Sequence, residues 1–68
     1  METKLLPWGE RIRRGRLERG LTAGDLAKKA HVSISTIYGI EGGQRNPRPG
    51  NLRKILEALQ KTPKVPGI

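Results

Sequence analysis

Apolar residues recur at helical spacing most clearly near the end of the chain. Four of them occupy positions i, i+3, i+4 and i+7 and so share one face of a helix: Leu52, Ile55, Leu56 and Leu59. Pro63 and Pro66 prevent this helix from continuing, because proline has no N–H to donate and crowds the preceding turn. The pattern predicts an amphipathic helix that packs against a core and ends near residue 60.

A first helix is predicted over residues 7–19. Pro7 suits the first turn of a helix, where its missing N–H needs no partner, and Gly20 can end the helix in the left-handed conformation. The side chains expected to be buried are Trp8, Ile12 and Leu17. The arginines expected to point mostly into solvent are Arg11, Arg13, Arg14 and Arg19.

Two short helices follow, and each begins at a capping residue. Thr22 is a suitable N-cap, and Asp25 three residues later completes a capping-box pattern for a helix that ends near Ala30. Ser33 is a second N-cap, for a helix that ends near Glu41, and "GGQRNPRPG" is then a loop. Two short helices joined by a turn form a helix-turn-helix. The predicted fold class is therefore all-α, a compact bundle of four or five short helices that contains this unit.

The same pattern divides the chain into three segments. Residues 1–6 are expected to be a flexible N-terminal lead-in, residues 7–60 the helical domain, and residues 61–68 a flexible basic tail. No apolar run reaches the roughly 18 residues of a membrane span, and "METKLLPWGER" lacks the apolar core of a signal peptide. We therefore expect a cytoplasmic protein that has no membrane partner.

The net charge of the chain points to a class of partner for this small helical domain. Fourteen Lys and Arg face six Asp and Glu, which gives the 68 residues a formal net charge of +8. A polyanionic partner would relieve the self-repulsion of such a chain, although a merely basic, soluble surface is the alternative. Trp8 and Tyr38 are its two aromatic residues, too few for the base stacking by which single-stranded nucleic acids are bound.

Several kinds of chemistry are excluded or disfavoured by composition. The chain has no cysteine, and His31 is its one histidine, so disulfides and thiolate metal sites are excluded and a metal centre is not expected. No nucleophile–base pair and no phosphate-cradling glycine motif is visible, and a substrate pocket would need a longer chain. We therefore predict no catalytic residue, no metal ligand and no cofactor, and we do not expect an enzyme.

The order and spacing of several short motifs resemble a known family. The stretch "ERIRRGRLERGLTAGDLAKKAHVSISTIYGIEGGQRNP" resembles the Cro/Xre type of helix-turn-helix, the fold of phage repressors. Its most specific pieces are "RGLT", "DLAKKA", "VSISTI" and "IEGGQRNP", and the resemblance runs from about Trp8 to Leu59. It implies a repressor-like transcriptional regulator that binds double-stranded DNA as a homodimer, in the cytoplasm at the nucleoid.

The resemblance also assigns roles to residues of the second short helix and the loop after it. The helix from Ser33 to Glu41 would enter the major groove. The positions that match base-contacting ones are Ile34, Ser35, Tyr38 and Gly39. The positions that match phosphate-contacting ones are Thr22, Ser33, Thr36, Gln44, Arg45, Asn46 and Arg48. Packing of Ile34 and Tyr38 against the domain or a partner is the alternative for those two.

Two further expectations come from the resemblance. Arg16 and Glu41 match a partly buried ion pair that ties the first helix to the end of the recognition helix, with two separate surface charges as the alternative. His31 stands in the turn where the family commonly has glycine, so a positive φ is expected there.

One feature of the recognition helix separates two possible functions. "HVSISTIYGI" has no Arg, Lys, Gln or Asn, the residues that make the bidentate base contacts of the major groove. For a DNA-binding regulator this predicts modest or shape-dependent specificity. The alternative is a protein-interaction module, antitoxin-like or a bridging factor of the transcription machinery, with a protein partner and weak or non-specific DNA binding.

Overall fold

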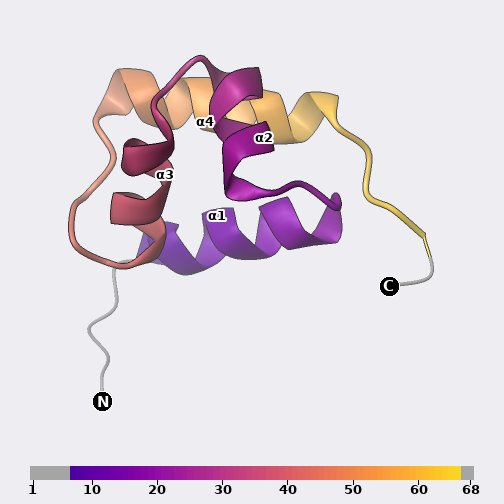
Figure 1. Ribbon diagram of the computed structural model, residues 1–68, viewed down its shortest axis with the longest axis horizontal. Helices are drawn as coiled ribbons and strands as arrows, with labels where there is room; N and C mark the ends of the chain where they lie inside the picture. Colours follow the sequence, from indigo (N-terminus) through magenta and orange to yellow (C-terminus); the bar gives the residue numbers. More distant parts are fainter. Residues whose placement is uncertain (1–6, 67–68) are drawn as a thin grey trace.

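The computed structural model describes residues 7–66, and helices account for most of them. These are α1 (Pro7–Glu18), α2 (Ala23–Ala30), α3 (Ile34–Glu41) and α4 (Pro49–Lys61). In Figure 1 the longer helices α1 and α4 run in the same general direction, with α3 between them and α2 crossing in front of α4 in this view. The described residues contain no strand. The predicted all-α bundle is thus confirmed with four helices, while the predicted lead-in, residues 1–6, lies outside the described part of the chain.

The caps predicted for the two central helices are present. At α2 the Thr22 hydroxyl accepts a hydrogen bond from the Asp25 amide at 3.0 Å, and the Asp25 carboxylate accepts one from the Thr22 amide at 3.1 Å. At α3 the Ser33 hydroxyl accepts from the Thr36 amide at 3.2 Å. Each cap satisfies helix-terminal N–H groups that have no intrahelical partner. These local bonds explain why both helices begin where the sequence predicts.

The turn between α2 and α3 depends on a residue with positive φ. His31 has φ 59° and ψ 42°, the left-handed conformation expected from its place in the turn. The amide of Val32 then donates to the carbonyl of Ala27 at 3.0 Å, which closes α2, and the Val32 side chain packs against the core. The turn therefore fixes the direction in which α3 leaves α2.

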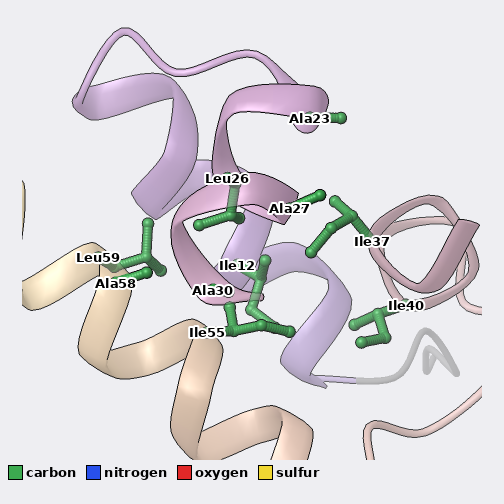
Figure 2. Close-up of a cluster of buried hydrophobic side chains, with 10 residues drawn as sticks. All are labelled: Ile12, Ala23, Leu26, Ala27, Ala30, Ile37, Ile40, Ile55, Ala58 and Leu59. Atoms are coloured by element: carbon green, nitrogen blue, oxygen red, sulfur yellow. The ribbon is translucent and has the colours of Figure 1, made fainter. Parts of the chain in front are cut away.

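All four helices contribute to one hydrophobic core. Figure 2 shows the buried side chains that converge between the helices. They are Ile12, Ala23, Leu26, Ala27, Ala30, Ile37, Ile40, Ile55, Ala58 and Leu59. Alanine at several α2 positions lets its neighbours approach closely, which is how so short a helix can occupy the middle of the bundle.

Two predictions for the first helix, expected over residues 7–19, were wrong. Leu17 is 51% exposed, because it lies five residues after Ile12, about 140° around the helix from the core-facing side. Arg19, predicted to point outward, instead donates from Nε to the carbonyls of Leu59 at 2.6 Å and Thr62 at 2.8 Å. It therefore caps carbonyls at the end of α4, where a cation is favourable.

The beginning of the predicted tail contacts α1. Lys61 still belongs to α4, the amide of Val65 donates to the carbonyl of Glu18 at 3.0 Å, and the Lys64 ammonium lies 3.5 Å from the Glu18 carboxylate. As far as Pro66, the structure thus shows a segment that contacts the end of α1, while the flexible tail expected over residues 61–68 stays a prediction. The attachment depends on a carbonyl freed where α1 ends, which helical periodicity does not reveal.

The capping box predicts an acid-sensitive α2. The hydrogen bond from the Thr22 backbone amide lowers the pKa of the Asp25 carboxyl, and the Thr22 side chain, Lys28 and Lys29 act in the same direction. The pKa of Asp25 is therefore lower in the folded state than its unfolded value of about 4, so the ionised carboxylate stabilises the fold. This stabilisation is fully present above about pH 4 and is lost as the pH falls through the folded-state pKa. Asp25→Asn should therefore have a lower Tm than the parent at pH 7.

Melting curves between pH 7 and pH 2 test this prediction. The difference in Tm between the parent and Asp25→Asn should shrink as the solution is acidified, because both side chains are then neutral. Glu57→Gln, which removes an exposed carboxylate from α4 and leaves the capping box intact, is the control. A difference that stays constant over this pH range would contradict the assignment.

Candidate nucleic-acid interface

One side of α3 is buried and the other is open. Ile37 and Ile40 face the core, whereas Ile34 is 43% exposed, Tyr38 is 60% exposed and Ser35 is also exposed. We call Ile34, Ser35 and Tyr38 the α3 outer face. Three of the four residues predicted to contact bases thus share one surface. Tyr38 is mostly exposed within this chain, whereas Ile34 is partly covered and lies near the first turn of α2, so contact with bases and packing against a partner both stay predictions.

Gly39, the fourth of those residues, differs from the expectation because it is buried. The side chain of Arg45 covers it. A Cβ atom at Gly39 would lie only 2.9 Å from Nε and 3.1 Å from Cδ of Arg45. The side chain that occupies position 39 on this helix is therefore that of Arg45, which the sequence alone does not indicate.

The N-termini of α2 and α3 lie close together. A Cβ atom at Gly24, in the first turn of α2, would be 3.6 Å from Cδ1 of Ile34, the first residue of α3. The caps use the amides of Asp25 and Thr36, so the earliest amides of both helices keep no intrahelical partner. Thr22 and Ser33, both exposed, flank those amides. Helix dipole and free N–H groups together make this edge attractive to phosphate.

The loop after α3 folds back over the helix it leaves. Gly43 has φ 77°, and the amides of Gln44 and Arg45 both donate to the carbonyl of Gly39, at 2.9 Å and 3.3 Å. This return brings the remaining predicted phosphate-contacting residues beside α3. Those that are exposed in the loop are Gln44, Arg45, Asn46 and Arg48. Thr36 is half-buried and lines a small hollow together with the loop.

An ion pair connects α1 to the end of α3. The Arg16 guanidinium donates from Nε and Nη2 to the two oxygens of the Glu41 carboxylate, each at 2.8 Å, and from Nη1 to the carbonyl of Leu21 at 3.0 Å. The two side chains are 14% and 9% exposed. The hydrogen bond to Glu41 raises the pKa of Arg16, against the opposing effect of burial. The geometry is the one implied by the resemblance and not that of two separate surface charges.

The described residues show neither a metal-binding cluster nor a membrane-spanning helix. Within residues 7–66, no group of three acidic or histidine side chains lies close enough to hold a metal ion. No helix in this part of the chain is long and apolar enough to cross a membrane.

Comparisons with known proteins agree with this geometry. The sequence model of a family described as "Helix-turn-helix" matches residues 12–65. The chain is 43% identical over 54 residues to the "HTH-type transcriptional repressor RghR" of Bacillus subtilis (strain 168), covering 78% of this chain and 40% of that protein. It is 40% identical over 55 residues to the "Uncharacterized HTH-type transcriptional regulator RghRB" of the same organism, covering 79% and 40%. The chain thus spans about two fifths of the length of these relatives.

Proposed function

Because this chain belongs to the Cro/C1-type helix-turn-helix family, we propose that it is a transcriptional regulator that binds double-stranded DNA. The observation that carries the proposal is the position of the α3 outer face. This exposed face is bordered by the adjoining N-termini of α2 and α3 and by a basic loop. A convex helix with anion-attracting groups on both sides fits the major groove between two phosphate backbones.

In the proposed complex, the α3 outer face meets base edges. Ile34 offers a methyl surface to thymine, Ser35 can donate or accept a hydrogen bond, and the Tyr38 hydroxyl reaches a base or a phosphate. Residues around this face hold the DNA backbone and so set the position of α3 without reading sequence. They are the amides of the first turns of α2 and α3 and the side chains of Thr22, Ser33, Thr36, Gln44, Asn46 and Arg48.

We further propose that the protein acts as a homodimer on two half-sites about one helical turn apart, in the cytoplasm at the nucleoid. Two copies that each make the contacts above would multiply the modest specificity of one recognition helix. The net charge of +8 adds a salt-sensitive attraction to DNA of any sequence.

A second candidate function has its own supporting observation. Leu17, Ile34 and Tyr38 are large side chains that remain exposed. A protein partner could cover them, as expected for an antitoxin-like or bridging module. Such a complex would tolerate salt, whereas binding to DNA through phosphates weakens steeply as salt is raised.

Enrichment of the purified protein on a random duplex DNA library, at low and at moderate salt, tests the proposed function. A palindromic motif that survives moderate salt would support a dimeric regulator and give the spacing of the half-sites. Binding with no motif would contradict sequence-preferring regulation. No binding at either salt would contradict the proposal as a whole and favour the protein-interaction module.

Tyr38→Ala tests the orientation of α3. Because the ring is largely exposed, the substitution should leave Tm nearly unchanged, but it should weaken binding to the preferred sequence about tenfold and alter the preference at one or two base pairs. Leu17→Ala, which truncates an exposed side chain on α1, is the control and should change neither. If Tyr38→Ala retains the preferred sequence and its affinity, α3 does not enter the groove by this face.

A further inference from the structure

The position of Arg45 is determined by the backbone as well as by its side chain. After α3, the left-handed turn at Gly43 reverses the chain, and the carbonyl of Gly39 accepts hydrogen bonds from the amides of Gln44 and Arg45. Arg45 is thereby bound to the backbone of Gly39, which lies shortly before the end of α3 at Glu41. Its location is not that of a side chain in an unconstrained loop.

The side chain of Arg45 occupies the space that a side chain at position 39 would fill. Cγ, Cδ and Nε of Arg45 lie 3.2, 3.1 and 2.9 Å from where a Cβ of Gly39 would be. In a helix a Cβ leans toward the residue four positions earlier, which here is Ser35 on the α3 outer face. Thr36, three positions before Gly39, also lines a hollow together with Arg45. The stem of Arg45 therefore takes the place of a side chain at position 39, one of the positions that match base-contacting ones.

The Arg45 guanidinium differs in its partners from those of Arg16 and Arg19. Arg16 is bound to Glu41, and Arg19 is bound to backbone carbonyls. For Arg45, no acidic side chain or carbonyl within residues 7–66 accepts a hydrogen bond from the guanidinium, and the residue is exposed. Its donors are available to a ligand, and its stem is held against Gly39.

We infer that Arg45 binds a guanine in the major groove, and that the absence of a side chain at Gly39 leaves the space that the stem of Arg45 occupies. This inference rests on the proposed DNA-binding function. The planar guanidinium can donate two hydrogen bonds to O6 and N7 of guanine, the contact that α3 cannot make with Ile34, Ser35 and Tyr38. The loop after α3 thus supplies a guanidinium that can bind a base edge, which the α3 outer face does not contain.

Seating the stem on Gly39 gives this contact its specificity. An arginine free in a loop would neutralise phosphates of any sequence, because it would have no fixed register against the bases. Contact along Cγ, Cδ and Nε removes much of the freedom of that side chain before DNA is bound. The guanidinium is then presented at one place along the helix, and so to one base pair.

Library enrichment with Arg45→Ala and Gly39→Ala tests the inference against the parent. In the parent, the motif should contain a G·C pair whose replacement weakens binding about tenfold or more. Both variants should lose this preference and keep the preferences at other positions. Arg45→Ala combined with Gly39→Ala should lose no more than Arg45→Ala alone, because the added methyl acts by displacing Arg45.

Two control variants distinguish base recognition by Arg45 from the effect of losing one positive charge and from the effect of adding a methyl group to a helix. Arg48→Ala removes the same charge from the same loop and should weaken all sequences about equally while leaving the motif intact. Gly50→Ala adds the same methyl to α4, where no atom lies within 4 Å, and should leave both motif and affinity unchanged. Gly39→Ala should not lower Tm, because the methyl meets only the side chain of Arg45, an exposed residue that can leave its place over Gly39 while α3 keeps its contacts with the core.

Three results would overturn the inference. If Arg45→Ala weakens all sequences by the same factor, Arg45 contacts phosphate and the proposed function stands without this reading role. If the parent binds DNA without a motif, neither Arg45 nor α3 reads bases. If the parent does not bind duplex DNA, the proposed function and the inference fail together. Arg45→Ala truncates the side chain of an exposed residue outside the core, so it decides the question even if Gly39→Ala fails to fold.

Discussion

Arg16→Ala is expected to lower the free energy of unfolding by roughly 3–5 kcal/mol. The guanidinium makes two bonds of 2.8 Å to the Glu41 carboxylate, and both side chains are almost withdrawn from water. Removing it leaves the carboxylate without its partner in a place where water cannot solvate it fully. The carbonyl of Leu21 also loses its donor. The loss is large against the total of about 5–15 kcal/mol that stabilises a typical domain.

Urea denaturation followed by circular dichroism measures this effect, and Arg14→Ala provides a matched control. Arg14 also faces a glutamate, Glu10, but at 3.8 Å and with side chains that are 71% and 62% exposed. An exposed pair of this kind contributes less than about 1 kcal/mol. Equal losses in the two variants would mean that the Arg16–Glu41 pair is no more than a surface contact. Glu41→Gln, which keeps an acceptor for Arg16 but removes the charge, should fall between them.

The helix boundaries could be predicted because they are determined by neighbouring residues. Thr22 and Asp25 are three residues apart and satisfy each other's amides, so the start of α2 follows from a short stretch of sequence. Periodicity predicted the face of α4 for the same reason, since Ile55 and Leu59 lie one turn apart and are both buried. The positive φ of His31 was instead expected from the resemblance, because the family commonly has glycine at that place in the turn.

The errors concern residues whose surroundings come from distant parts of the chain. Arg19 was expected in solvent because it is charged, but the carbonyls it binds, at Leu59 and Thr62, lie forty residues or more along the sequence. Only the packing of α4 against α1 brings them within reach. Leu17 was expected in the core because it is apolar, although the helical period places it away from Ile12.

For the candidate site, sequence predicted the exposed side of α3 but not its composition. Ile34 and Tyr38 could be placed because Ile37 and Ile40 use the opposite side of the same helix. The position of Arg45 over Gly39 depends on the path of the loop, which reverses at Gly43. A glycine in the middle of a short helix was the available signal, since glycine there costs about 1 kcal/mol and therefore calls for a reason.

Gly9→Ala is expected to lower the free energy of unfolding by about 2 kcal/mol, although alanine is the better helix former. Gly9 is buried in α1, and a Cβ there would collide with the carbonyl oxygen of Ile40 and lie 3.3 Å from that of Glu41. Overpacking of this kind costs about 1–3 kcal/mol, and occasionally more. Backbone atoms of α3 cannot move aside as a side chain can, so the gain in helix propensity of about 1 kcal/mol does not offset the cost.

Gly15→Ala, in the same helix, is the matched comparison for urea denaturation. Its added methyl would meet Cδ1 of Leu59 at 3.2 Å, the end of a side chain that can shift by a few tenths of an ångström. The variant should be at least as stable as the parent, because propensity then dominates. If Gly9→Ala is as stable as Gly15→Ala, α1 and α3 are not in close backbone contact.

The collision that Gly9→Ala would cause also affects the α3 outer face and Arg45. The carbonyl of Ile40 that the methyl would displace accepts the amide of Gly43, the residue at which the loop reverses toward Arg45. A shift of α3 against α1 would therefore move the α3 outer face and the Arg45 guanidinium together. Gly9→Ala should weaken binding to the preferred DNA more than Gly15→Ala does, under conditions where both variants are fully folded. Equal binding by the two would show that the orientation of α3 does not depend on its contact with α1.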